Sequence, residues 1–161
     1  MPTRYPVPKP EVLQDVLSAL VGADVRIALQ KQPHLDEDAP SVLAEFVDAD
    51  DQPGALCRVD HTGAISLAGA LNGTPADTVE QAIEGYRLDD AALENTREIV
   101  NVLAQLFNSD HTPPVRFHEM YRQPGKLPDA AQQLRRAPAG VRHFTVTVPG
   151  FTAGLMSFLI A

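Results

Sequence analysis

Three polar residues, Glu94, Glu98 and Asn101, have the types and the spacing needed to direct a water molecule at an electrophile. Separations of four and three residues place their side chains on one face if the segment is helical. Glutamate supplies negative charge, and asparagine donates and accepts hydrogen bonds without changing its protonation. Phosphoryl transfer in particular depends on such positioning more than on covalent chemistry. The alternative is the ordinary solvated face of an amphipathic helix, which carries no chemistry.

The segment that must position these residues, Asp89–Asn108, has the clearest helical period in the chain. At 3.6 residues per turn one broad face carries Leu93, Thr96, Ile99, Val100, Leu103, Leu106 and Phe107, with Ala92 and Ala104 at its edges. The opposite face carries Glu94, Glu98, Asn101, Gln105 and Asn108. Asp89 or Asp90 is expected to cap the first turn. The sequence therefore predicts a helix with one buried side and one side open to a partner.

The remaining elements are predicted from hydrophobic periodicity, capping residues and turn residues. Strands are expected at Val25–Leu29, Val42–Asp48, Ala55–Val59, Val115–Tyr121, His143–Val148 and Leu155–Ile160. Further helices are expected at Glu11–Val21, Asp60–Gly73, Thr74–Gly85 and Asp129–Arg136. Clustered strands with helices grouped between them favour an α+β fold, in which a largely antiparallel sheet has its helices packed on one face. We expect residues 11–161 to form a single domain after an extended lead-in at residues 1–10.

Details of packing also follow from the patterns. In the strand Val115–Tyr121, alternation places Val115, Phe117 and Tyr121 on one face. In the strand His143–Val148, it places Phe144, Val146 and Val148 on one face. The helix Asp60–Gly73 is rich in glycine and alanine, so we expect it to pack closely against its neighbours.

Composition excludes several classes of partner. The 161-residue chain has 13 basic and 21 acidic residues and a formal net charge of −8, so neither nucleic acid nor an anionic membrane is expected as a partner. The longest apolar run is too short to span a bilayer, and the first ten residues do not resemble a signal peptide. The single cysteine, Cys57, rules out an internal disulfide and favours a reducing compartment. We therefore expect a cytoplasmic protein.

Other candidate sites have simpler explanations. The run His34, Asp36, Glu37 and Asp38 could attract a cation but lacks the glycine-turned spacing of a calcium loop, so we interpret it as a solvated acidic loop. His111, His118 and His143 lack the spacing of metal ligands. His118-Glu119 begins like a zinc-protease motif, but Arg122 stands where the second histidine would be. No metal site is predicted.

Two further features are assigned structural roles. Cys57 could act as a nucleophile only beside a histidine-type base, and on a central strand a small buried residue is the expected role. Asn72-Gly73-Thr74-Pro75 is interpreted as a turn between helices, because it lacks the Lys-Ser/Thr pattern of a phosphate-binding loop.

The tetrapeptide Glu98-Ile99-Val100-Asn101 and the order of elements around it resemble the CheC/CheX family of chemotaxis phosphatases, most closely the single-site CheX type. The resemblance covers about Glu11–Ala161. It implies removal of phosphate from the aspartate of a phosphorylated response regulator. By this resemblance, Asn101 would align the attacking water, and Glu98 would contact the lysine in the active site of the regulator. The magnesium ion would belong to the regulator, so the chain itself would need no cofactor.

The chain departs from the family pattern at two places. Glu94 stands where the family has Asp or Ser, so it keeps an oxygen acceptor on a longer arm. The family's distal proline has two candidate positions. Pro124 has the matching spacing, whereas Pro113 or Pro114 has the matching place just before a strand.

The leading prediction is an aspartyl-phosphate phosphatase whose partner is a phosphorylated receiver domain, with Glu98 and Asn101 as catalytic residues and Glu94 and Gln105 as binding residues. One alternative is a non-catalytic domain of the same fold that binds a receiver domain or dimerises. A weaker alternative is an unrelated α+β ligand-binding module with an apolar pocket. A homodimer is expected from the resemblance and from the apolar terminal strand, which would be a liability as a bare sheet edge.

Overall fold

A computed structural model describes residues 2–31 and 40–161. The α-helices are α1 (Pro10–Val21), α2 (His61–Asn72), α3 (Ala76–Glu84), α4 (Asp90–Leu103) and α5 (Asp129–Arg136). The strands are β1 (Arg26–Gln30), β2 (Ser41–Val47), β3 (Pro53–Asp60), β4 (Arg116–Tyr121), β5 (Gly140–Thr147) and β6 (Gly154–Ile160). Short 3₁₀ helices are η1 (Ala104–Phe107) and η2 (Pro124–Lys126). The predicted elements are therefore all present, with boundaries shifted by a few residues.

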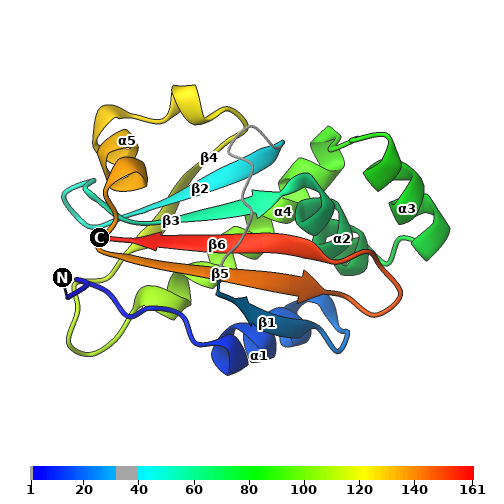
Figure 1. Cartoon of the computed structure of the whole chain (residues 1–161), viewed down its shortest axis with the longest axis horizontal. Helices are drawn as coiled ribbons and strands as arrows, with labels where there is room; N and C mark the ends of the chain where they lie inside the picture. The colour runs from blue at the N-terminus through cyan, green and yellow to red at the C-terminus, as the bar shows by residue number, and fades with distance from the viewer. Residues whose placement is uncertain (1, 32–39) are drawn as a thin grey trace.

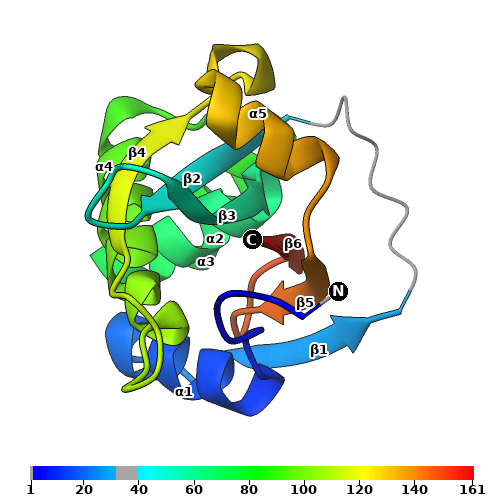
Figure 2. The ribbon, with the colours of Figure 1, turned by 90° about the vertical axis from the view of Figure 1, so that its left-hand side faces the viewer.

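The strands form one antiparallel sheet in the order β1-β5-β6-β3-β2-β4 (Figure 1). Helices α1, α2 and α4 cover one face of this sheet, and α3 lies beside α2 at one end of the molecule. The view from the side shows α1 and α4 together, whereas α5 lies apart from them (Figure 2). The α+β fold with an antiparallel sheet is confirmed, and α5 adds a short helix on the second face.

The main core lies between the sheet and helices α1, α2 and α4. Phe107 stands at its centre, with ring centroids 5.1 Å from Phe46 and 5.8 Å from Phe158. Phe144 extends this cluster, with its ring centroid 5.9 Å from that of Phe158. The predicted inward face of β5 is confirmed, because Phe144, Val146 and Val148 are all buried in this core.

Helix α2 lies unusually close to the end of β6. A Cβ built on Gly154 would lie 2.2 Å from the Cα of Gly63, so this contact requires glycine. The carboxylate of Asp60 accepts hydrogen bonds from the backbone N–H of Gly63 (2.7 Å) and of Leu155 (3.0 Å). Asp60 thus caps α2 and ties it to β6, which confirms the close packing expected of this glycine-containing helix.

The predicted inward face of β4 is wrong at Tyr121. Glu45 of β2 pairs with Glu119, but the next residue, Phe46, pairs with Phe117, so His118 is an extra residue in β4. Such a β-bulge shifts the alternation of side chains by one residue. Tyr121 therefore turns away from the main core to a second cluster beneath α5, composed of Leu43, Leu56, Leu127, Ala131 and Leu134. Met120 occupies the main core in its place.

The C-terminal strand is not an edge. Strand β6 lies between β5 and β3 and pairs with both, so the edge argument for a homodimer fails. The segment before α1 lies against the end of this strand, because the backbone N–H of Arg4 donates to the carbonyl oxygen of Ala161 (2.7 Å) and Tyr5 is buried. The division into a lead-in at residues 1–10 and a domain at 11–161 stays a prediction.

Candidate functional site

Helix α4 is capped at its start and buried along its inner face. The carboxylate of Asp89 accepts a hydrogen bond from the backbone N–H of Ala92 (2.8 Å), which confirms the predicted cap. The inner face consists of Thr96, Ile99, Val100 and Leu103, with at most 2% of each residue exposed. The buried hydroxyl of Thr96 donates to the carbonyl oxygen of Ala92 (2.7 Å), so its polarity is satisfied within the helix.

The outer face of α4 borders an open hollow of about 480 Å³. The side chains around it are Glu94, Asn95, Arg97, Glu98, Asn101 and Phe117. The structure therefore brings together the three residues singled out by their spacing, and Glu94, Glu98 and Asn101 are all exposed. Among the described residues, neither Glu98 nor Asn101 uses its side chain in a hydrogen bond or an ion pair. Both are accordingly available to an incoming molecule.

The other two polar residues of the outer face lie elsewhere. Gln105 is exposed but outside the hollow, and its amide donates to the carbonyl oxygen of Val102 (3.0 Å). Asn108 has a structural role, because its side chain accepts from the backbone N–H of Val115 (2.8 Å) and donates to the carbonyl oxygen of Val115 (3.2 Å). Asn108 thereby fixes the end of the helix to the start of β4.

Arg97 ties α4 to the neighbouring strand. One guanidinium nitrogen lies 2.6 Å from a carboxylate oxygen of Glu119, and another lies 3.7 Å from Glu94. Hydrogen bonds from the backbone N–H of Met120 and from Arg97 lower the pKa of Glu119 below its usual value. Of the two glutamates that line the hollow, Glu94 therefore has a cationic partner, whereas Glu98 does not.

Three residues of the hollow were missed from the sequence. Arg97 lies three residues after Glu94, so a pairing between them could have been found from helical spacing. Asn95 directly follows Glu94, so the spacings of three and four residues that group Glu94, Glu98 and Asn101 do not include it. Phe117 comes from β4, and only the tertiary structure brings it to the hollow.

The hollow offers carboxylates, amides and an aromatic side chain, but no metal-ligand set. Within residues 2–31 and 40–161, no group of three or more His, Cys, Asp or Glu side chains could hold a metal ion. The candidate cation run at His34, Asp36, Glu37 and Asp38 lies outside the described residues. The site can therefore position a water molecule and bind a cationic group.

The remaining candidates from the sequence, among them Cys57 and His143, are explained by their place in the fold. Cys57 is fully buried, and this burial raises the pKa of its thiol, so it is a small core residue as expected. His143 shares a hydrogen bond of 2.7 Å between its Nδ1 atom and the hydroxyl of Ser157. The turn at Asn72-Gly73-Thr74-Pro75 joins α2 to α3, as predicted, with Gly73 at a φ of 69°.

The position of the family's distal proline is still open. Pro124 begins η2, whereas Pro113 and Pro114 lie just before β4, which begins at Arg116. None of these prolines lines the hollow beside α4.

In the part of the chain that the structure describes, every helix is too short or too polar to cross a membrane.

No family model matches the sequence, and no curated protein matches it. Solved structures do match. A chain of the FliM–SpeE complex from H. pylori aligns with a TM-score of 0.66 at 10% identity, covering 94% of this chain and 80% of that chain. FliY from Thermotoga maritima aligns with a TM-score of 0.58 at 14% identity, covering 92% and 82%.

A further match is the CheX-CheY-BeF3-Mg+2 complex from Borrelia burgdorferi, with a TM-score of 0.49 at 15% identity and 93% coverage of each chain. At these identities the likeness concerns the fold alone, and the FliM and FliY structures carry it. The order of elements, the sheet and the FliM and FliY alignments agree with the fold implied by the resemblance seen in the sequence. The chain therefore has the CheC/CheX-type fold that the middle domains of FliM and FliY share.

Proposed function

We propose that this chain is a CheC/CheX-type domain that hydrolyses the aspartyl phosphate of a response-regulator receiver domain. The observation that carries the proposal is the pair Glu98 and Asn101, exposed together on one face of α4 and lining one hollow. Their helix is fixed by the buried residues Ile99, Val100 and Leu103. Catalysis by positioning requires that the element carrying the side chains be held in place by the fold.

In this mechanism Asn101 holds a water molecule through its carboxamide, which both donates and accepts. The water oxygen forms a bond to phosphorus while the bond to the aspartyl oxygen breaks. Inorganic phosphate and a free aspartate carboxylate result, and the proton of the water leaves with the phosphate or to solvent. Glu98 binds a cationic group of the partner, since Glu94 already lies beside Arg97. A magnesium ion, where required, is supplied by the receiver domain.

A second candidate function is a non-catalytic interaction domain of the same fold. Two solved structures that carry the fold assignment are complexes, FliM-SpeE and FliG-FliM, with TM-scores of 0.66 and 0.61. The same fold is thus found in proteins that assemble with other proteins.

A homodimer and a cytoplasmic location are part of the proposal and remain predictions.

The experiment that separates the two functions is dephosphorylation of phosphorylated receiver domains from the same organism. Wild type is compared with the double variant Glu98→Ala, Asn101→Ala. The matched control is Asp129→Ala, Gln133→Ala, which removes an acid and an amide from the exposed side of α5 on the other face of the sheet. We expect wild type and the control to accelerate phosphate release, and the site variant to lose this acceleration while it stays folded.

Binding of a receiver without acceleration by wild type would favour the interaction domain. Full activity in the Glu98→Ala, Asn101→Ala variant would contradict the proposed mechanism, because the two side chains would then have no role in hydrolysis.

A further inference from the structure

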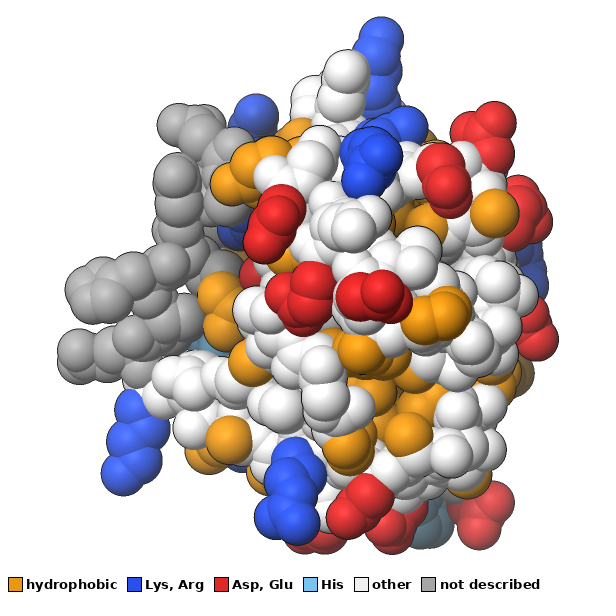
Figure 3. Space-filling model, turned by 90° about the vertical axis from the view of Figure 1, so that its right-hand side faces the viewer, with side chains coloured by type: hydrophobic (Ala, Val, Ile, Leu, Met, Phe, Trp, Pro, Cys, Tyr) orange, Lys and Arg blue, Asp and Glu red, His pale blue; other side chains and the backbone are white. Residues whose placement is uncertain are grey.

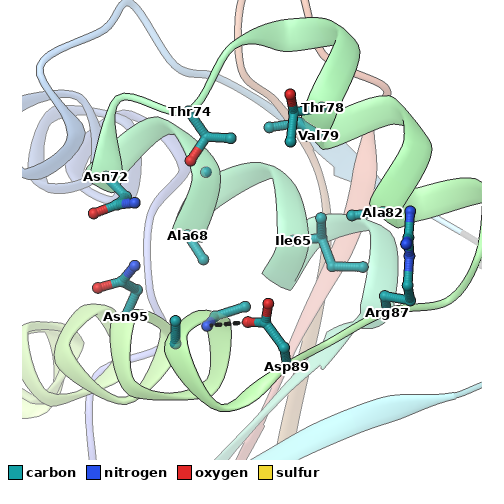
Figure 4. Close-up of a pocket in the computed structure, with 13 residues that line it drawn as sticks. Ile65, Ala68, Asn72, Thr74, Thr78, Val79, Ala82, Arg87, Asp89 and Asn95 are labelled. Atoms are coloured by element: carbon teal, nitrogen blue, oxygen red, sulfur yellow. Dashed lines mark hydrogen bonds between the residues drawn. The ribbon is translucent and has the colours of Figure 1, made fainter.

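A second pocket lies at the N-terminal half of α4, where α2 and α3 meet it (Figure 4). Its volume is about 150 Å³. The floor is apolar and includes Ile65, Ala68 and Val79. Figure 4 shows Asn72 and Asn95 pointing toward each other at one side, with Arg87 on the far side of the pocket. The molecule's α3 end faces the viewer in Figure 3, where hydrophobic side chains gather among charged ones.

The pocket is built by close packing around small residues. A Cβ on Gly69 would lie 2.6 Å from a methyl carbon of Val79, so α3 approaches α2 as closely as glycine permits. Ala68, Ala82 and Ala92 leave room between the three helices where larger side chains would fill it. A space of this volume holds one branched aliphatic or aromatic side chain, since a cavity of roughly 150 Å³ accepts benzene.

Arg87 gives the pocket a cationic rim. Within residues 2–31 and 40–161, its guanidinium makes no hydrogen bond and no ion pair. The nearby carboxylate of Asp89 is engaged with the backbone N–H of Ala92. A guanidinium at the rim of an apolar pocket favours an incoming carboxylate, with which it can form two parallel hydrogen bonds.

Tyr86, next to Arg87, has a conformation that its own side chain disfavours. Its φ is 52°, in the left-handed region, and 67% of the residue is exposed. Backbone hydrogen bonds at the end of α3 hold it there, since Tyr86 donates to Ile83 and Arg87 donates to Ala82. Glycine is the usual residue at such a position. Exposed tyrosine and arginine are the residue types that dominate binding at protein interfaces.

The pocket adjoins the hollow that contains Glu98 and Asn101. Asn95 lines both, so the two lie side by side along α4. We infer that this pocket is a docking point for the partner protein: one apolar side chain of the partner fills the floor, and a neighbouring carboxylate pairs with Arg87. Docking here would hold the partner over Glu98 and Asn101, so the inference rests on the proposed function for the identity of the partner.

Two variants test the pocket without touching the hydrolytic pair. Arg87→Ala removes the charge, and Ala82→Leu fills space in the pocket. With a phosphorylated receiver domain as partner, we expect each variant to raise Kd and KM about tenfold. The kcat should stay within about twofold of wild type, because Glu98 and Asn101 are intact. The control is Arg26→Ala, which removes an exposed arginine from β1.

A third variant, Tyr86→Gly, excludes a merely structural effect. Glycine relieves the left-handed conformation, so the melting temperature should rise while binding of the receiver weakens. Weaker binding by a more stable protein cannot come from damage to the fold.

The outcomes separate this inference from the proposed function. If wild type binds receiver domains without hydrolysing the phosphate, and the variants bind them more weakly, the docking pocket is supported and the phosphatase function is excluded. Unchanged Kd and KM in both Arg87→Ala and Ala82→Leu overturn the docking pocket, whatever the rate of hydrolysis. Failure of wild type to bind any receiver overturns both proposals.

Discussion

The two sides of α4 differ completely in what surrounds them. The inner side carries Ile99, Val100 and Leu103, none more than 1% exposed, packed into the main core. The outer side carries Glu98 and Asn101, which are exposed and make no side-chain hydrogen bond or ion pair within the described residues. Burial of the inner side stabilises the helix, so the helix does not depend on contacts made by the polar groups of its outer side.

Because the two sides have separate surroundings, stability and activity should be separable along this one helix. Substitutions on the inner side are expected to change the free energy of unfolding. Substitutions on the outer side are expected to change binding or hydrolysis. Substitutions at Phe107, Asn101, Tyr86 and Arg97 test this separation.

The largest effect is expected where the helix ends in the core. Phe107→Ala should lower the free energy of unfolding by about 3–5 kcal/mol, because it leaves a cavity between Phe46 and Phe158. Chemical denaturation followed by circular dichroism measures this change. Phe107→Leu, which keeps most of the volume, should lose clearly less. An equal loss in both variants would mean that ring contacts rather than volume stabilise this site.

On the outer side, Asn101→Ala should reduce the rate of receiver dephosphorylation by roughly 100-fold. The free energy of unfolding should change by no more than about 0.5 kcal/mol, since the side chain is exposed. Phosphate release and denaturation are measured on the same preparations. Marked destabilisation by this substitution would break the separation between the two sides of α4.

Tyr86 is expected to reverse the usual relation between a surface residue and stability. Tyr86→Gly should raise the free energy of unfolding by about 1 kcal/mol, because φ of 52° is costly for tyrosine and not for glycine. Thermal denaturation measures the gain. Tyr86→Ala keeps the strained conformation and is the control. A loss of stability in the glycine variant would show that the tyrosine ring makes a stabilising contact.

The smallest effect is expected at the Arg97–Glu119 pair, where the outer side of α4 meets β4. The pKa of Glu119 is lowered in the folded state, so its ionised form stabilises the fold above its ordinary pKa of 4.5. This contribution is lost as the pH falls through the lowered folded-state pKa.

Arg97→Ala should therefore lower the free energy of unfolding by about 0.5 kcal/mol at pH 7 and less at pH 3, because the pair is partly exposed. Urea denaturation at the two pH values measures the difference, and 1 M salt should shrink it. An effect that is larger at pH 3 than at pH 7 would contradict the pairing.

Most elements were predictable because their signals are local. The period of α4, its cap at Asp89 and the alternation of Phe144, Val146 and Val148 all depend on residues close in sequence. The grouping of Glu94, Glu98 and Asn101 was predictable for the same reason, since helical spacing alone brings them together. Their catalytic roles remain part of the proposed function.

The predictions that proved wrong concern residues whose positions depend on contacts between separate elements. The bulge at His118 depends on how β4 pairs with β2, and it reversed the predicted direction of Tyr121. The composition of β6 is compatible with an edge strand or a central strand. Its pairing with both β3 and β5 makes it a central strand. Asn108 was predicted on the outer polar face of the helix, but the structure uses its side chain in two hydrogen bonds to the backbone of Val115, which helical spacing does not predict.

Local sequence patterns were enough to predict helix α4, its two faces and the α+β class, because hydrophobic periods of 3.6 and 2 residues indicate which side of each element is buried. The residues that lie beside the outer face of α4 could be identified only from the folded arrangement. It brought Phe117 to Glu98 and Asn101, tied Arg97 to Glu119, and formed the pocket rimmed by Arg87. These contacts join separate elements, and their geometry is set by strand register and by helix packing around glycine and alanine.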